Sequence, residues 1–398
     1  MRAAYIVDIL RTPIGKFGGS LASVRPDDLA CLVIRKLLER NKGVDTSLIE
    51  DVVFGAANQS GEDNRNVARM ASLLAGLPVE VGGVTVNRLC ASGLQAIMNA
   101  ANGVMLGQGD IYIAGGVESM SRAPFVMAKS EEAFSRKTEI YDTTLGWRFI
   151  NSKLSALYHP YSMGETAENV AEKWKITRES QDEFAFHSNR KYFAASEAGK
   201  FANELVSVPV TTSKGDISQV EKDEHPRVTS LEKLATLKPA FKANGSVTAG
   251  NSSGINDGAA ACLVVSEEML KQLSLTPLVR IVSMAIAGVD PAYMGVGPVP
   301  ATKKALHRAG ITTNDIELVE LNEAFASQSL ACIRDLDLNP DIVNVNGGAI
   351  ALGHPLGCSG VRISATLIHE MKKSNVRYGI ATMCIGVGQG ATVVYELQ

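Results

Sequence analysis

Residues 84–107, VTVNRLCASGLQAIMNAANGVMLG, hold the end of a strand, a sharp junction and a helix in one run. Val84 to Asn87 is typical of the end of a buried strand, and Ser92 to Leu106, rich in small and apolar residues, predicts a helix. Cys90 lies at the junction. Unpaired N–H groups and the positive end of the dipole at a helix N-terminus favour a thiolate. Cys90 is therefore a candidate nucleophile, and a small buried hydrophobic residue is the alternative.

The same alternation of strands and helices surrounds this stretch. Strands are predicted at Ala3–Ile9, Asp51–Gly55 and Ile111–Ala114, and helices at Arg25–Arg40 and Asn64–Leu77, with Asn64 as the cap of the second helix. Such an order indicates an α/β fold with a mostly parallel sheet covered by helices.

The C-terminal part repeats this order. Strands are predicted at Leu278–Ala285, Ile316–Leu321, Val343–Val345, Tyr378–Met383 and Thr392–Glu396, and helices at Ala301–Ala309, Ala324–Leu336 and Ser359–Lys372. Ser92-Gly93 and Ser359-Gly360 are 267 residues apart, and the same offset places Val117 on Cys384. We therefore expect two duplicated layered α/β domains, packed so that the loops at their strand ends meet.

Residues 119–248 break this order. They are more polar, with predicted helices at Thr166–Lys175 and from Thr177, as the N-cap, to about Ser196. A strand at Ala259–Ser266 then returns to the first domain. We expect an N-terminal core domain of residues 1–118 and 249–273, an inserted domain of residues 119–248, and a C-terminal core domain of residues 274–398.

Composition excludes several classes of protein. The 398 residues carry a net charge of -3, which gives no indication of nucleic-acid binding. The six cysteines lack CxxC spacing, so reduced thiols in a cytoplasmic compartment fit better than a disulfide scaffold. Neither a secretory signal nor an apolar run of membrane-spanning length is visible, and no sequence pattern supports a metal site.

Four stretches combine a polar residue or a cysteine with a strand end and flanking glycines. They are NRLC at 87–90, LNEAF at 321–325, NGGAIALGHPLGCSG at 346–360 and CIGVGQG at 384–390. Taken singly, His354 is more often a satisfied buried histidine, Cys384 a packing residue and Asn322 a cap for the helix that follows it. The glycine runs do not follow the dinucleotide-binding pattern, and no G-x-S-x-G elbow ends a strand.

Together these stretches resemble the thiolase family, over essentially the whole chain and in the family's order. The resemblance implies an αβαβα sandwich of two duplicated core domains with an inserted CoA-binding loop domain. It also implies an acetyl-CoA C-acyltransferase that cleaves a 3-oxoacyl-CoA with free CoA. Family members are homodimers or homotetramers, CoA is a substrate, and no cofactor is expected.

The resemblance also implies roles for the motif residues. Cys90 would be the acylated nucleophile, His354 would take its proton and later polarise the thioester oxygen, and Cys384 would be the acid and base at the α-carbon. Asn322 would position a water that completes one oxyanion hole with His354. The N–H groups of Cys90 and Gly386 would form the other oxyanion hole.

Residues at matching positions of the loop domain would contact CoA. Met163, Phe241, Ala249 and Ser253 would line the pantetheine and adenine path, and Arg227 is a candidate for a phosphate.

Two departures resemble the degradative branch of the family. Ser162 stands where biosynthetic members commonly have histidine, and Val387 replaces the middle glycine of the last motif. Because valine resists positive φ, we expect an ordinary backbone conformation there. Three loops, at 61–78, 118–129 and 141–151, are similar to 3-oxoadipyl-CoA thiolases. A dicarboxylic acyl chain would require a cation, for which Arg148 and Arg65 are candidates.

Two alternatives stay open at this point. One is a biosynthetic enzyme that forms acetoacetyl-CoA from two acetyl-CoA. The other, from a different class, is a thiolase-like protein that binds acyl-CoA or lipid without turnover, which would predict the loss of one of the four catalytic groups.

Overall fold

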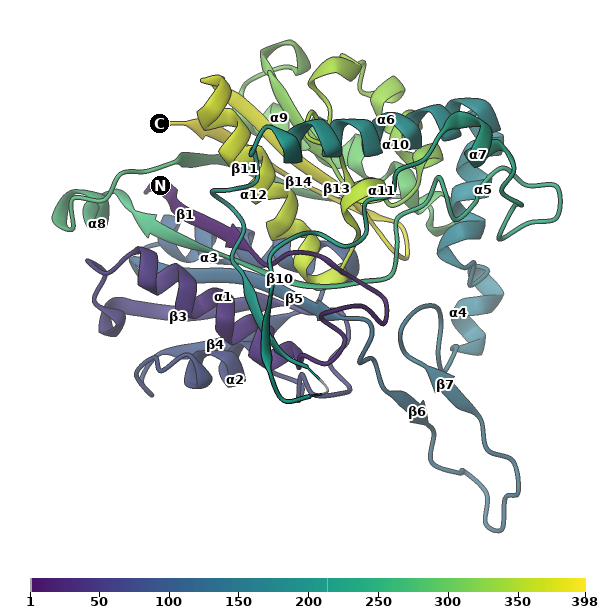
Figure 1. The fold of residues 1–398 in the computed structure, drawn as a ribbon, viewed down its shortest axis with the longest axis horizontal. Coiled ribbons are helices and arrows are strands. Elements are labelled where there is room, and N and C mark those ends of the chain that lie inside the picture. The colour runs from purple at the N-terminus through teal and green to yellow at the C-terminus, as the bar shows by residue number, and fades with distance from the viewer. Residues whose placement is uncertain (1, 213) are drawn as a thin grey trace.

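The computed structural model describes residues 2–212 and 214–398, and a sheet of ten strands forms its centre (Figure 1). The path of the sheet is β12-β13-β14-β11-β1-β10-β5-β3-β4, and β2 pairs with β10. The strands are β1 (Ala4–Arg11), β2 (Gly15–Lys16), β3 (Ile49–Gly55), β4 (Gly82–Val86), β5 (Ile111–Ser119), β10 (Asn256–Ser266), β11 (Val279–Gly288), β12 (Leu318–Leu321), β13 (Tyr378–Ile385) and β14 (Gln389–Leu397). Two residue pairs between β1 and β11 join an N-terminal and a C-terminal half.

Helices form three layers around the two halves of the sheet (Figure 1). Helices α1 (Pro26–Arg40) and α2 (Val67–Leu74) pack on the outer face of the N-terminal half. Helices α9 (Pro298–Ala309) and α10 (Ala326–Asp335) pack on the outer face of the C-terminal half. Between the halves, α3 (Ser92–Met105) and α12 (Leu356–Ser374) share one buried core with strands of both. The five layers confirm the predicted αβαβα sandwich.

The predicted internal duplication is visible in these elements. Strand β5 begins at Ile111 and β13 at Tyr378, which is the 267-residue offset read from the sequence. The two Ser-Gly pairs at this offset lie where α3 meets α12. An added Cβ at Gly93 would stand 2.6 Å from the carbonyl oxygen of Gly357, and one at Gly360 would overlap the backbone nitrogen of Leu94. The two central helices therefore touch through their backbones.

The expectation of a mostly parallel sheet was wrong. Only β3–β4, β3–β5 and β12–β13 run parallel among the pairs along this path. Strand β10 follows the long insertion and returns antiparallel between β1 and β5, and β14 follows β13 through a tight turn. Helical crossovers, which produce parallel pairs, thus occur only toward the outer strands.

Three local predictions were also wrong. Strand β4 is an edge strand with Val84 41% exposed, so it is not a buried strand. Residues 343–345 contribute a single bridge from Val343 to Val319. Helix α2 is capped by the side chain of Asn66, which accepts from Arg69 N–H, so Asn64 precedes the cap. Strand and helix ends depend on long-range pairing that local propensity does not contain.

The inserted segment adds helices and short strands. They are β6 (Phe125–Met127), β7 (Ile140–Asp142), α4 (Ser152–Leu157), α5 (Met163–Lys173), α6 (Arg178–Glu197), β8 (Val208–Thr211), β9 (Ile217–Val220) and α7 (Leu231–Ala235). Of these, β6, β7, α4 and α5 lie on the right in Figure 1, and α6 crosses the top. Ser162 and Glu165 form a capping box on α5, and Thr177 caps α6 as predicted. Short helices α8 (Glu267–Gln272) and α11 (Ala349–Leu352) follow later. In the described chain no helix combines the length and apolarity that crossing a bilayer requires.

The contact between α3 and α12 generates a stability prediction. Alanine in place of a helical glycine usually stabilises a helix. In Gly360→Ala the new methyl group would instead overlap the backbone of α3, so we expect the free energy of unfolding to fall by about 2 kcal/mol. Urea denaturation measures this change. Gly43→Ala, whose methyl group would meet open space, is the control, and equal stability of the two variants would contradict the proposed packing.

Candidate active site

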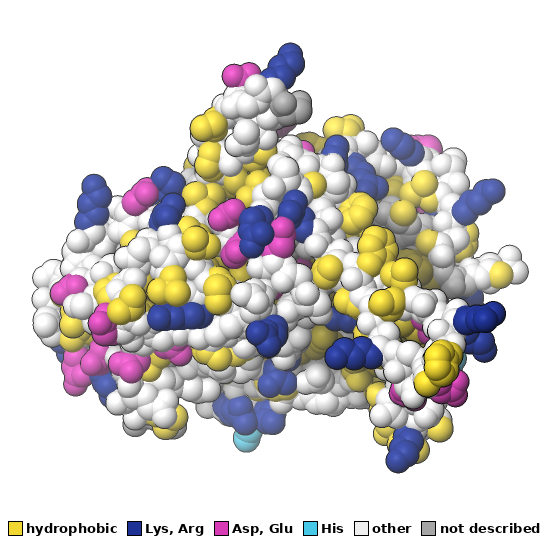
Figure 2. Space-filling model, turned by 90° about the horizontal axis from the view of Figure 1, so that it is seen from below, with side chains coloured by type: hydrophobic (Ala, Val, Ile, Leu, Met, Phe, Trp, Pro, Cys, Tyr) yellow, Lys and Arg dark blue, Asp and Glu magenta, His cyan; other side chains and the backbone are white. Residues whose placement is uncertain are grey.

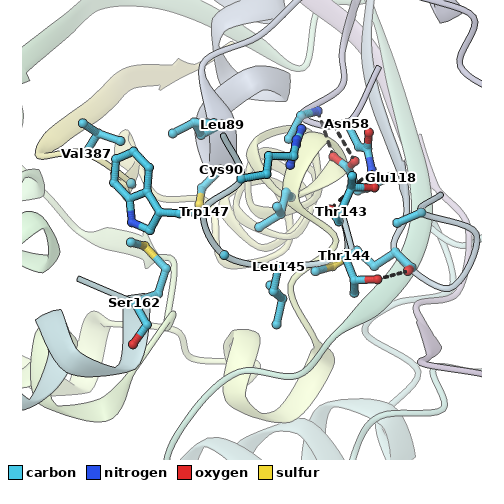
Figure 3. Close-up of a pocket in the computed structure, with 18 of the residues that line it drawn as sticks. Asn58, Leu89, Cys90, Glu118, Thr143, Thr144, Leu145, Trp147, Ser162 and Val387 are labelled. Carbon is cyan, nitrogen blue, oxygen red and sulfur yellow. Dashed lines mark hydrogen bonds between the residues drawn. The ribbon is translucent and has the colours of Figure 1, made fainter. Parts of the chain in front are cut away.

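Cys90 lies in a 3-10 turn, Leu89–Ala91, between β4 and α3. Hydrogen bonds fix this turn: Leu89 N–H donates to Asn87 Oδ1 at 2.8 Å, and Ser92 Oγ donates to the Leu89 carbonyl at 2.6 Å. Leu89 itself has a φ of 47°. The Cys90 side chain lines a cavity of about 310 Å³, together with Trp147, Ser162 and Val387 (Figure 3). The junction therefore presents the sulfur to a half-open cavity large enough for an acyl chain.

Burial, and not the helix N-terminus, controls the charge of this thiol. The N–H groups of Gly386 and of Cys90 itself lie within hydrogen-bond reach of the sulfur and favour its thiolate. Desolvation is the larger effect and raises the pKa of Cys90 to about 11. The net shift is opposite in direction to the one that the helix N-terminus alone favours. At neutral pH Cys90 is a thiol that needs a base to remove its proton.

His354 is held as a neutral imidazole. It precedes α12, and its backbone N–H donates to Asn256 Oδ1 at 3.0 Å. Its Nδ1 lies 2.6 Å from Ser359 Oγ, and that hydroxyl donates its proton to the Pro355 carbonyl at 2.8 Å. Since a hydroxyl has one proton, Nδ1–H must be the donor to Ser359, which leaves the lone pair on Nε2.

The electrostatic surroundings reinforce this state of His354. Burial, with a smaller contribution from the charge of Arg362, lowers the pKa of His354 to about 3. The imidazole therefore stays uncharged at all physiological pH values and can accept a proton at Nε2.

Asn322 and Cys384 lie on the C-terminal side of the site. The Asn322 Nδ2 atom is 3.5 Å from both ring nitrogens of His354. Its Oδ1 is buried and has no hydrogen-bond partner among the described residues. Helix α10 begins only at Ala326, with Phe325 at the cap position, so the reading of Asn322 as a helix cap was wrong. Its amide oxygen is left available to a polar group in the site.

Cys384 lies near the end of β13 and packs against Met163, Ala324 and Phe325. Burial, with the neighbouring Cys90 as a smaller cause, raises the pKa of Cys384 well above its ordinary value. Two thiols and one imidazole are thus all uncharged at rest.

The turn between β13 and β14 corrects a further expectation. Val387 has a φ of 62° and Gly388 a φ of 76°, so valine does adopt the left-handed conformation here. Ile385 pairs with Gln389 across a tight turn, and positive φ at successive residues matches the twist of the two strands. A β-branched residue in this conformation is strained. Val387 also lines the cavity, so the strained turn borders the site.

The residues expected to contact CoA fall into separate places. Met163 begins α5 and lines the cavity of Cys90. Arg227 and Ala249 line a second cavity of about 140 Å³. Phe241 packs edge-on against Phe325 at 6.2 Å, and Ser253 N–H donates to the Ala324 carbonyl at 3.0 Å. Phe241 and Ser253 line neither of these two cavities, but they border the loop that follows Asn322.

Sequence reasoning missed three polar residues of the site. Ser359 sets the tautomer of His354, and Asn256 holds its backbone. Glu118 lines the cavity and accepts hydrogen bonds from the N–H groups of Ala57, Asn58 and Gly357. Its position at the end of buried β5 was a usable signal. The sequence contains no such signal for Asn256, because it is 98 residues from His354 in the chain.

Comparisons with known proteins identify the class. Residues 4–268 match the family model for "Thiolase, N-terminal domain" and residues 275–397 the one for "Thiolase, C-terminal domain". The chain belongs to the thiolase family. It is an acyltransferase of the acetyl-CoA C-acyltransferase class, and it catalyses CoA-dependent thiolytic cleavage of a 3-oxoacyl-CoA.

Individual relatives are similar over their full length. The chain is 55% identical to "3-oxoadipyl-CoA/3-oxo-5,6-dehydrosuberyl-CoA thiolase" of Escherichia coli (strain K12) and 53% identical to "Beta-ketoadipyl-CoA thiolase" of Acinetobacter baylyi, covering 100% of each chain. Among solved structures, human mitochondrial 3-ketoacyl-CoA thiolase in complex with CoA has a TM-score of 0.92 and 40% identity, with 100% of this chain and 98% of that chain covered. Bacillus anthracis acetyl-CoA acetyltransferase has a TM-score of 0.94 and 43% identity, with 100% and 99% covered.

The charge states of the site predict a flat pH profile. If His354 Nε2 takes the Cys90 proton, its low pKa keeps the base form present throughout the range from about pH 5.5 to 8. Single-turnover acylation by an acyl-CoA should then vary little with pH. A loss of rate below an apparent pKa near 6.5 would contradict the neutral imidazole. A tenfold rise per pH unit would instead indicate that the reactive thiolate forms by loss of the Cys90 proton to solvent and not to His354.

Proposed function

We propose that this enzyme cleaves 3-oxoadipyl-CoA with free CoA, giving acetyl-CoA and succinyl-CoA through a succinyl group on Cys90. The observation that carries the proposal is the full-length similarity to relatives named for this substrate, together with the cavity beside Cys90. Two of the three loops noted in the sequence, 118–129 and 141–151, contribute residues 118, 120, 123 and 143–148 to that cavity, whereas the loop at 61–78 contributes none.

The first half of the proposed reaction forms the acyl-enzyme. His354 Nε2 takes the thiol proton as the Cys90 sulfur bonds to C3 of the substrate, and the N–H groups of Cys90 and Gly386 stabilise the oxyanion on C3. The C2–C3 bond then breaks. The protonated His354 and a water held by Asn322 stabilise the acetyl-CoA enolate, and Cys384 donates a proton to its α-carbon. Acetyl-CoA leaves.

The second half transfers the acyl group to CoA. The Cys384 thiolate takes the proton of the incoming CoA thiol, and the CoA sulfur attacks the acyl carbonyl. The bond to Cys90 breaks, and His354 returns its proton to the Cys90 sulfur. The pKa of each group shifts with the charge of its neighbour, so the two thiols can act at different steps. Met163, Phe241, Ala249 and Ser253 line the path proposed for CoA, with Arg227 at a phosphate, and no further cofactor is required.

Condensation of two acetyl-CoA to acetoacetyl-CoA is the second candidate. It uses the same groups in reverse, and the similarity to the Bacillus anthracis acetyl-CoA acetyltransferase favours it. Biosynthetic members of the family commonly have histidine at the position of Ser162, which here caps α5. We therefore prefer the degradative reaction.

We also propose a cytoplasmic homo-oligomer, a dimer or a tetramer. The six cysteines are free, as expected in a reducing compartment. Leu73, Leu74, Val79 and Val84 are exposed on α2, on edge strand β4 and between them. Unpaired edges and apolar patches favour association. On the face drawn in Figure 2, hydrophobic side chains form several groups between charged ones.

Substitution of Cys90 or of Cys384 should affect different half-reactions. We expect Cys90→Ala to abolish acylation, whereas Cys384→Ala should still be acylated by an acyl-CoA but lose at least about a hundredfold in C–C bond cleavage and formation. Burst kinetics and α-proton exchange measure the two steps. Cys31→Ala, in buried α1 away from the cavity, is the control and should retain both. Loss of both steps together in Cys384→Ala would refute the separate roles.

A substrate panel tests the proposed specificity. At equal CoA, thiolysis of 3-oxoadipyl-CoA should exceed that of acetoacetyl-CoA and of a medium-chain 3-oxoacyl-CoA in kcat/KM by at least about tenfold. A preference for either monocarboxylic substrate would mean that the relatives' substrate does not extend to this chain.

A further inference from the structure

The cavity of Cys90 contains a single cationic side chain among the described residues of its lining. The lining carries two charged groups, Arg148 and Glu118, and is otherwise apolar or uncharged. The carboxylate of Glu118 accepts three backbone N–H bonds of 2.8–2.9 Å, from Ala57, Asn58 and Gly357. The Glu118 oxygens therefore bond to the backbone, and Glu118 does not form an ion pair with Arg148.

Arg148 is half-buried, and in the described chain no carboxylate lies within ion-pair distance of it. A guanidinium presents five donors in a fixed planar geometry that suits a carboxylate. Partial burial removes water from such a group, and an anion arriving in the cavity would restore its interactions.

The loop that carries Arg148 is held at several points. Thr143 Oγ1 accepts from Asn58 Nδ2 at 2.8 Å and donates to the Pro124 carbonyl at 2.6 Å. Trp147 Nε1 donates to the Tyr161 carbonyl at 2.9 Å. Figure 3 shows the Trp147 ring beside Cys90, with Thr143 and Glu118 across the cavity. A loop without regular structure is thus anchored on both sides of residues 144–146, which fixes where Arg148 enters the cavity.

We propose that Arg148 binds the distal carboxylate of a dicarboxylic acyl chain whose carbonyl carbon is bonded to Cys90. The inference rests on the proposed function and deepens it, because it assigns the group that distinguishes a dicarboxylic from a monocarboxylic substrate. The apolar walls at Leu89, Met120 and Leu145 accommodate the methylene groups between the two ends. Arg65, the other candidate from the sequence, is exposed and outside this lining, so it does not fill the role.

The test compares two substrates of equal chain length, 3-oxoadipyl-CoA and 3-oxohexanoyl-CoA, which differ in the terminal carboxylate. In Arg148→Met we expect kcat/KM for 3-oxoadipyl-CoA to fall about ten- to a hundredfold, chiefly through KM, because a charge-assisted hydrogen bond is lost. The value for 3-oxohexanoyl-CoA should stay the same or rise. Arg148→Lys should keep part of the preference. Arg136→Met, exposed between β6 and β7, is the matched control and should behave as wild type.

Three results of this experiment would overturn the role proposed for Arg148, and they differ in what they imply for the proposed function. An unchanged ratio of the two substrates in Arg148→Met, with wild type preferring 3-oxoadipyl-CoA, would overturn the role of Arg148 and leave the proposed function standing. An equal fall for both substrates with a raised KM for CoA would assign Arg148 to CoA and overturn the proposal. Failure of wild type to prefer 3-oxoadipyl-CoA would overturn both.

Discussion

The backbone contact between α3 and α12 is the constraint on which the rest of the structure depends. Only glycine at positions 93 and 360 lets the two helices approach so closely. Their shared core joins the two halves of the sheet. Cys90 lies two residues before the start of α3 and His354 two residues before the start of α12, so the contact brings together loops that are 264 residues apart in the chain. The duplication thereby becomes chemically asymmetric: one copy supplies a thiol and the other an imidazole.

Burial then determines how the site handles protons. Desolvation outweighs the N–H groups around Cys90, raises the pKa of both thiols and lowers that of His354. All three groups rest uncharged in surroundings where an unpaired charge is costly. In the proposed mechanism a proton therefore moves as each bond forms or breaks, and the oxyanion donors are in place beforehand. Ser359 sets the tautomer of the His354 imidazole that leaves Nε2 free to accept a proton, and Asn256 holds the His354 backbone.

Much of the candidate site could be proposed from the sequence because its residues stand in short motifs. Cys90, Asn322, His354 and Cys384 each lie within a few residues of a strand end or helix start, where flanking glycines mark the loop. Strands and helices with strong periodicity were also predicted within a few residues of their bounds.

The predictions that were wrong concern features that depend on contacts between distant segments. The direction of β10 is set by the long insertion before it, and the positive φ of Val387 is imposed by pairing across the hairpin. The partners of His354 lie on β10 and one turn into α12, and the thiol state of Cys90 follows from how much protein surrounds it. Sequence spacing does not report either burial or pairing register.

The central claim is that Cys90 carries the acyl group while the C-terminal residues move the protons. Mass spectrometry of the peptide that contains Cys90, after brief incubation with 3-oxoadipyl-CoA in the absence of free CoA and an acid quench, tests this most directly. The account predicts a succinyl thioester on Cys90 and an unmodified Cys384. A succinyl group on Cys384, or release of acetyl-CoA with no adduct on Cys90, would contradict it.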